Sequence, residues 1–189
     1  MHIGTGNYND RTAKLYTDLG LFSADPELGA DIHDFFNELT GSSHPPAGRY
    51  RHLAVAPTHL LPWLLEWIER EIEHARAGRP SGIRAKINGL ADAEVIQALY
   101  KASEAGVSVE LAVRGICTLR PGLSGRSSRI RVVSILGRFL EHARIYQFSN
   151  GGDERFFIGS ADWRPRNLRR RVEVVAPVRA EELRGRLRT

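Results

Sequence analysis

One histidine, His142, lies in the stretch of the chain whose residue types best suit phosphate chemistry. Arg144 follows it, and a loop of small and polar residues, Gly159-Ser160-Ala161-Asp162, comes soon after. Further arginines follow the loop: Arg164, Arg166, Arg169, Arg170 and Arg171. Arginine binds phosphate oxygens through paired N–H donors, and histidine can move protons or accept a phosphoryl group. The combination predicts an anion-binding site, although a histidine alone is more typical of a structural role and arginines alone of a solvated face.

The residues around His142 predict a hairpin that positions them. Residues 143–148 alternate aromatic and β-branched side chains as a strand does, and residues 155–158 form the returning strand. Asn150-Gly151-Gly152-Asp153 between them is a turn signal, because Asn and Gly tolerate positive φ. We therefore expect His142 near the start of one strand and the small-residue loop at the end of the other.

Strands and helices alternate through the region before the hairpin. Residues 83–113 predict a strand, a helix and a second strand, so the two strands should be parallel. Ligands of such sheets bind beyond the carboxyl ends of the strands, where Arg114 stands. Residues 172–175 should form the last strand, which Pro177 is expected to stop, and residues 180–187 begin a helix.

Two further helices should pack on the sheet. Asp25-Pro26 is a helix start and Gly41 an end, and Phe35 and Phe36 are expected in the core. A longer amphipathic helix follows Thr58, with Glu66, Glu69, Arg70, Glu71 and Glu73 on its outer face.

These segments resemble the C-terminal catalytic region of polyphosphate kinase. The motifs that carry the resemblance are GRFLEHARIYQF, NGG, FIGSADW, RNL and RRVEV, preceded by KINGLADAEVIQALYKASEAGVSVELAVRGICTLRPG and HIGTGNYNDRTAKLYTDLGL, in the family's order. The resemblance implies an α/β fold of the phospholipase-D-like group, in which two similar domains build one site. We expect a mixed sheet flanked by helices in residues 49–189, with incomplete C-terminal helices, and the truncated tail of a preceding similar domain in residues 1–48. The likeness between HIGTGNYN and FIGSADWR independently predicts two copies of one architecture.

The resemblance also implies a reaction: reversible transfer of the γ-phosphate of ATP to inorganic polyphosphate through a phosphohistidine, with Mg²⁺ as cofactor. The family's phosphorylated histidine lies in a His-x-Lys motif upstream of the GTGN loop, as do the expected magnesium ligands, and this chain begins after that motif. His2, with Gly4 two positions later, is no replacement. ATP or ADP and polyphosphate are the expected ligands, no nucleic acid is required, and the chain alone is expected to be inactive.

Several site residues carry over from the family's motifs. His142 corresponds to the second site histidine, a general acid or base or a phosphate partner. Tyr16 corresponds to a nucleotide contact and Arg114 to a phosphate contact, although each residue alone is more typical of packing or of the surface. Arg171 and Glu173 match the RxE segment, in which the glutamate could orient an arginine or a histidine. The remaining expected phosphate contacts are Ser160, Asn167 and Asn7.

Composition narrows the possible partners and cellular location of the protein, and two alternative functions remain. The net charge of +5 and pI near 9.8 favour polyanionic partners. The chain has one cysteine, no signal pattern, no apolar stretch of bilayer length and no metal-binding Cys/His cluster, so we expect a cytoplasmic protein without its own metal site.

The arginine density also fits a non-catalytic polyphosphate- or nucleotide-binding module, and less well a phospholipase-D-like phosphodiesterase, because Arg144 stands where lysine is preferred. The resemblance leaves open a homo-oligomer and peripheral membrane association of the full-length enzyme.

Overall fold

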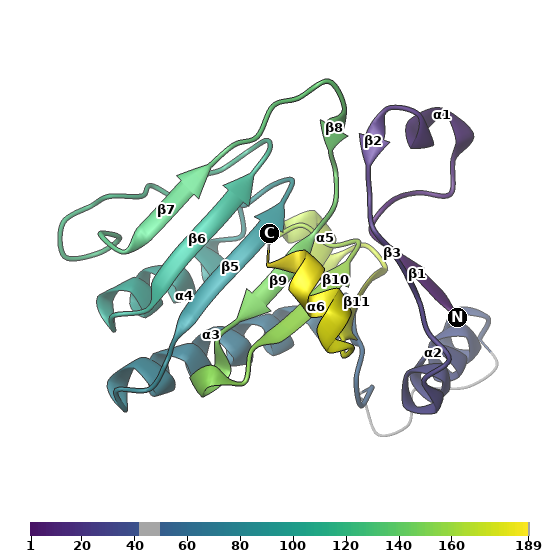
Figure 1. Ribbon diagram of the computed structural model, residues 1–189, viewed down its shortest axis with the longest axis horizontal. Helices are drawn as coiled ribbons and strands as arrows, with labels where there is room; N and C mark the ends of the chain where they lie inside the picture. Colours follow the sequence, from purple (N-terminus) through teal and green to yellow (C-terminus); the bar gives the residue numbers. More distant parts are fainter. Residues whose placement is uncertain (42–49, 189) are drawn as a thin grey trace.

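A seven-stranded mixed sheet forms the main body of the molecule (Figure 1). In the computed structural model, which describes residues 1–41 and 50–188, the strand order is β4-β11-β10-β9-β5-β6-β7. Its strands are β4 (Ala54–Ala56), β5 (Gly82–Ile87), β6 (Ser108–Val113), β7 (Ile130–Val133), β9 (Ile145–Phe148), β10 (Arg155–Gly159) and β11 (Glu173–Val178). β5, β6 and β7 are parallel, as expected for the β5–α4–β6 unit, and the remaining pairs are antiparallel. The predicted mixed sheet and the predicted hairpin are confirmed.

The prediction that Pro177 stops the last strand is wrong. Pro177 lies within β11, opposite Phe157 of β10, and the strand continues to Val178. β4 pairs with β11 only from Glu173 to Val175, so the side of Pro177 that faces away from β10 has no ladder partner. A proline without an N–H is tolerated at such a locally unpaired edge.

Helices cover the two faces of the sheet unequally (Figure 1). α3 (Leu60–Arg76) and α4 (Ala93–Glu104) bury their apolar sides in the main core on one face. Trp63 and Trp67 of α3 pack edge-on against Phe157, with ring centroids 4.9 and 5.3 Å away. The short helix α6 (Glu181–Leu187) packs Leu183 and Leu187 on the opposite face.

Glu71 contradicts the expected outer face of α3. Its side chain is completely buried. One carboxylate oxygen accepts the backbone N–H of Gly82 at 2.7 Å, and the other accepts that of Asn150 at 2.6 Å. Glu71 therefore fastens the start of β5 and the hairpin turn η2 (Asn150–Gly152) to α3, a tertiary role that helical periodicity does not reveal.

Residues 1–41 form a separate small layer beside the sheet (Figure 1). β1 (His2–Gly4) and β3 (Gly20–Phe22) make an antiparallel ribbon, with α1 (Asp10–Ala13) and β2 (Tyr16–Thr17) between them. β2 pairs in parallel with β8 (Leu140–Glu141), just before His142. The predicted domain boundary after residue 48 lies outside the described residues.

α2 (Pro26–Leu39) begins as predicted, with the Asp25 side chain accepting the N–H groups of Glu27 and Leu28. The expectation that Phe36 belongs to the core is wrong, because Phe36 is 58% exposed. Within residues 1–41 and 50–188, α2 packs Leu28, Ile32 and Phe35 against the narrow ribbon and the edge of the sheet, and this part of the chain leaves Phe36 uncovered.

The predicted internal repeat is present in the fold. The unit β1–α1–β3–α2 recurs as β10–α5–β11–α6, where α5 is Pro165–Arg169. The second copy lies 155 positions after the first, because Asp10 and Pro165 begin the two short helices. The register agrees: His2 pairs with Phe22 as Phe157 pairs with Pro177. The ribbons also pack against each other, since one apolar cluster joins Leu28 to Ala176 and another joins Leu183 to Leu19 and Leu21.

None of the helices in the described part of the chain has the length and hydropathy needed to cross a membrane.

Replacing Glu71 with alanine should lower the free energy of unfolding by about 2–3 kcal/mol, because two backbone N–H groups lose the carboxylate that accepts their hydrogen bonds. Urea unfolding measures this change. Glu73→Ala, at an exposed position of the same helix, should change the free energy by less than about 0.5 kcal/mol. Equal effects of the two substitutions would contradict the role assigned to Glu71.

Candidate functional site

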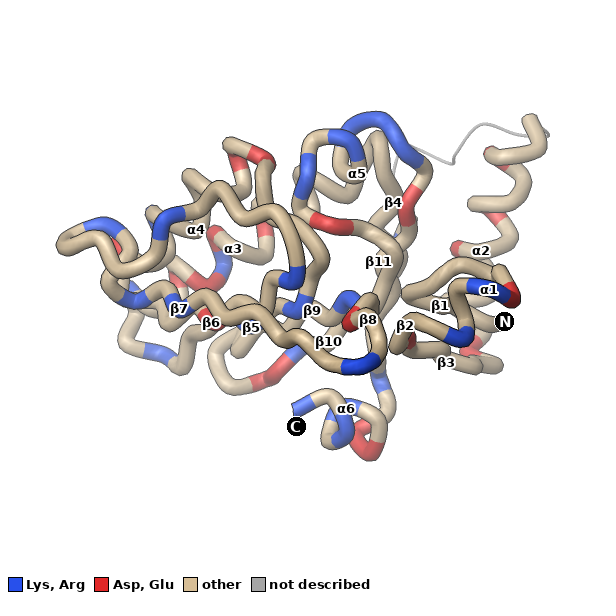
Figure 2. Tube along the Cα trace, turned by 90° about the horizontal axis from the view of Figure 1, so that it is seen from above, with Lys and Arg blue, Asp and Glu red and all other residues tan. Residues whose placement is uncertain are grey.

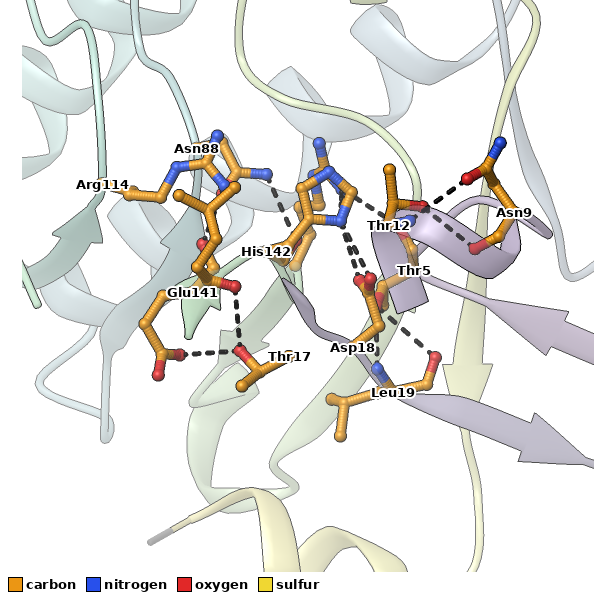
Figure 3. Close-up of polar contacts among 12 residues, drawn as sticks. Thr5, Asn9, Thr12, Thr17, Asp18, Leu19, Asn88, Arg114, Glu141 and His142 are labelled. Atoms are coloured by element: carbon orange, nitrogen blue, oxygen red, sulfur yellow. Dashed lines mark hydrogen bonds and ion pairs between the residues drawn. The ribbon is translucent and has the colours of Figure 1, made fainter. Parts of the chain in front are cut away.

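His142 lies where the two copies meet, held against Asp18 (Figure 3). Its backbone N–H donates to the Thr17 carbonyl at 3.1 Å, which extends the β2–β8 pairing into the site. Its Nδ1 lies 2.9 and 3.1 Å from the two carboxylate oxygens of Asp18. A charged carboxylate accepts hydrogen bonds only, so Nδ1 carries the proton in this contact and Nε2 keeps its lone pair.

Asp18 is in turn fixed by Thr5 of the small-residue loop. The Thr5 hydroxyl donates to Asp18 Oδ1 at 2.7 Å and accepts the N–H of Leu19 at 2.9 Å. The Thr5 N–H donates to the Leu19 carbonyl, also at 2.9 Å. Thr5 is buried, so the carboxylate is presented to His142 in one orientation.

Arg144 connects the loops of the two copies. Its Nε and Nη2 each lie 3.2 Å from an oxygen of Asp162, and its Nη1 donates to the Thr5 carbonyl at 2.9 Å. Nη1 also lies 3.3 and 3.1 Å from the two ring nitrogens of His142. An atom nearly equidistant from both nitrogens lies on neither lone-pair axis, so Nε2 is left available. Arg144 is buried and neutralised by Asp162, and it therefore organises the site rather than offering a free charge to a ligand.

These surroundings lower the pKa of His142. Burial is the main cause, and the positive charge of Arg144 adds to it, while the hydrogen bond and charge of Asp18 act in the opposite direction. His142 is consequently a neutral base near pH 7. Its carbonyl accepts the Asn88 side-chain N–H at 3.2 Å, which fixes the backbone as well.

The second copy contains the same support without a histidine. The Ser160 hydroxyl donates to Glu173, and Ser160 and Val174 exchange the same backbone contacts as Thr5 and Leu19. Thirteen positions separate hydroxyl and carboxylate in both copies. Asn167 donates to the other oxygen of Glu173 at 2.7 Å. Among the described residues, no histidine contacts Glu173.

The structure brings most of the predicted site residues together. The Tyr16 ring lies 4.8 Å from that of His142, and Arg114 Nη1 donates to the Glu141 carbonyl at 3.1 Å. Arg171 Nε lies 3.4 Å from Glu173, beside Ser160 and Asn167. Asn7 differs: it is exposed, and in the described structure its side chain makes no hydrogen bond. In the same loop, it is Thr5 whose side chain is fixed, through its hydrogen bond to Asp18.

Several arginines that follow the second loop remain exposed beside the site (Figure 2). Arg169 is bound by Asp92 and Glu94. Arg164, Arg166 and Arg170 have no carboxylate within ion-pair distance in residues 1–41 and 50–188. They give this end of the sheet a positive rim that attracts polyanions.

No group of three or more histidine, cysteine, aspartate or glutamate side chains in the described residues could hold a metal ion.

Comparison with known proteins shows the family of the chain. The family model "Polyphosphate kinase C-terminal domain 1" matches residues 1–45, and "Polyphosphate kinase C-terminal domain 2" matches residues 53–189. The chain belongs to the polyphosphate kinase family. It is 58% identical to the polyphosphate kinase of Thermosynechococcus vestitus over 94% of this chain, and 51% identical to that of Neisseria meningitidis over 98%. The crystal structure of the polyphosphate kinase of Porphyromonas gingivalis matches 98% of the chain with a TM-score of 0.92 and 42% identity.

The chain spans about a quarter of the length of these polyphosphate kinases: 24%, 27% and 28%, respectively. A phospholipase D family member from Salmonella typhimurium matches 71% of the chain with a TM-score of 0.48 and 16% identity, a similarity too weak to support an inference.

Protonation of His142 should destabilise the fold. Because the folded chain binds this proton more weakly than the unfolded chain, the free energy of unfolding should fall as the pH drops below about 6.5. Urea unfolding between about pH 7.5 and 5.5 measures this. The His142→Gln variant should lose less stability over that range than the parent chain, and equal losses would contradict a lowered pKa of His142.

Proposed function

We propose that this chain is the C-terminal catalytic portion of a polyphosphate kinase that reversibly transfers the γ-phosphate of ATP to inorganic polyphosphate through a phosphohistidine. The observation that carries the proposal is the repeated hydroxyl–carboxylate pair. Asp18 holds His142, and Glu173, 155 positions later, offers the same support to a histidine that the described residues do not contain. We place that histidine, the nucleophile, in another segment of the enzyme, as the resemblance to the family implies.

In the first step, the nucleophilic histidine attacks the γ-phosphorus of ATP. The new P–N bond forms as the bond to the bridging oxygen breaks, and ADP leaves with the electron pair. Glu173 accepts the Nδ1–H of the nucleophile, so its Nε2 lone pair points at phosphorus. In the second step, the terminal oxygen of polyphosphate attacks phosphorus and the P–N bond breaks.

Phosphoryl transfer depends on charge neutralisation and in-line positioning more than on new covalent chemistry. Arg114 and Arg171 are the cations proposed to bind phosphate oxygens, and the exposed rim of Arg164, Arg166 and Arg170 attracts the polyanion. Tyr16, beside His142, is proposed to contact the nucleotide. Neutral His142 can accept a proton or a hydrogen bond from a phosphate group through Nε2. Mg²⁺, when bound, would neutralise phosphate charge, and no step here is assigned to it.

The isolated chain is proposed to bind its ligands without turning over. Acid-labile phosphate incorporation from γ-labelled ATP should be absent both in this chain and in its His142→Ala variant. Labelling that is lost in His142→Ala would contradict the proposal, because His142 would then be the nucleophile. Absence of labelling together with salt-sensitive binding of tripolyphosphate is the expected pattern, since polyanion binding by arginine releases counterions.

A gain-of-function arm separates an incomplete enzyme from a binding module. The chain extended by the segment that precedes this region in the Thermosynechococcus vestitus relative should become labelled. Glu173→Gln in that extended protein should lower the labelling rate by about 100-fold or more, as expected when a histidine loses its orienting carboxylate. Glu182→Gln, an exposed glutamate on α6, is the control and should leave the rate unchanged. Failure of the extended protein to become labelled would favour the non-catalytic module.

A further inference from the structure

An ion pair beside His142 has no part in the steps above. Lys86 Nζ lies 2.5 Å from Glu141 Oε2, and Glu141 directly precedes His142. The two side chains are 23% and 26% exposed, so the pair is neither buried in the core nor freely solvated. It lies at the end of β5 nearest the site, on the face of the sheet that α3 and α4 leave open.

Glu141 is fixed from three elements of the fold, and Figure 3 shows two of the contacts, those with Thr17 and Arg114. The Thr17 hydroxyl donates to its carboxylate at 3.3 Å, and Arg114 Nη1 donates to its carbonyl oxygen at 3.1 Å. The hydrogen bond from Lys86 is the main cause that lowers the pKa of Glu141, so the carboxylate is charged at neutral pH. A carboxylate held in this way keeps the flexible lysine side chain in one place.

Lys86 also connects the site to a groove on the open face of the sheet. A small recess is lined by Lys86, Arg114 and Glu141, with Ala112 and Ile135. Lys86 and Ala112 also line the adjoining groove of about 310 Å³, which runs past Arg131 and past Arg84, whose charge Glu110 neutralises. The ammonium group of Lys86 therefore lies between the phosphate-binding arginine proposed above and a groove with further positive charge.

The chemistry of this position fits a phosphate ligand. An ammonium group has three N–H donors, and Glu141 accepts from Lys86 through one oxygen. Lysine is a common phosphate ligand and acts as a mobile point charge. We propose that Lys86 is a further phosphate-binding residue of this site, that its ligand is the condensed phosphate of ATP or polyphosphate, and that Glu141 is the residue that positions it. This inference rests on the proposed function.

The chain contains a matched pair that distinguishes this role from an ordinary surface ion pair. Arg84 lies two positions before Lys86 on the same face of β5 and pairs with Glu110 at 3.1 Å. These side chains are 59% and 49% exposed, and neither lines the recess with Arg114. An exposed ion pair of this kind contributes little to the stability of the fold, and its loss should not alter phosphate binding at the site.

Calorimetric titration of the chain with tripolyphosphate at several salt concentrations tests the proposal. Lys86→Met should weaken binding by about 10-fold and reduce the salt dependence by about one ion, whereas Lys86→Arg should keep most of the affinity. Arg84→Met should stay within about twofold of the parent chain. Thermal unfolding of each variant verifies that it is folded.

The positioning role of Glu141 has its own readout. If Glu141 acts through Lys86, then Lys86→Met should cost only about threefold in a Glu141→Gln background, instead of about 10-fold. An unchanged 10-fold cost would overturn the positioning role. Equal affinities of Lys86→Met and Arg84→Met would overturn the binding role of Lys86, while a loss of binding in Arg114→Ala would leave the proposed function intact. No binding by the parent chain would overturn the proposed function itself.

Discussion

The contact between Asp18 and His142 is the constraint on which the rest of the site depends. It joins residues 124 positions apart, and it forms only because β2 pairs with β8 and because the buried Arg144 holds the Thr5 carbonyl and Asp162 together. A histidine held through Nδ1 has one orientation and one free nitrogen. Burial and the charge of Arg144 lower the pKa of His142, so that this nitrogen is unprotonated near neutral pH, the state required for the proposed role of His142 as a base.

The structural repeat places a second carboxylate, Glu173, at the position that corresponds to Asp18. The two ribbons pack against each other, and each has a helix with leucine packed against the other copy and a small-residue loop whose hydroxyl donates to a carboxylate. In one copy, the carboxylate of Asp18 contacts His142. In the other, Glu173 is buried, bound by Ser160 and Asn167 and paired with Arg171, and no histidine of the described residues contacts it. The proposed phosphotransferase site, with one histidine on each carboxylate, uses both copies in the same arrangement.

Much of this could be predicted from the sequence, because it depends on local pattern. The hairpin after His142, the parallel β5–α4–β6 unit and the start of α2 follow from turn residues, periodicity and capping. The residues whose predicted environments were wrong depend on tertiary context. Glu71 is buried against a turn that is far away in the chain, and the described residues do not cover Phe36. Pro177 is tolerated because β4 is too short to pair with that part of β11. Asp18 lies in the same motif as Tyr16, but the sequence alone does not reveal its role. The role becomes apparent when the alignment of the two loops is continued for 13 residues beyond Thr5 and Ser160, where Asp18 matches Glu173. Lys86 and Glu141 come from different strands, and no spacing rule joins them.

The most direct test of this account is the protonation state of the His142 ring, measured by ¹⁵N NMR of the imidazole nitrogens at about pH 7.5, where an unperturbed histidine is neutral. The account predicts a single tautomer with the proton on Nδ1 and a bare Nε2, and a mixture of tautomers in the Asp18→Asn variant. The His142→Gln variant assigns the signals. A proton on Nε2 in the parent chain, or an unchanged ring signal in Asp18→Asn, would contradict the claim that the carboxylate of the first copy sets the chemistry of the site.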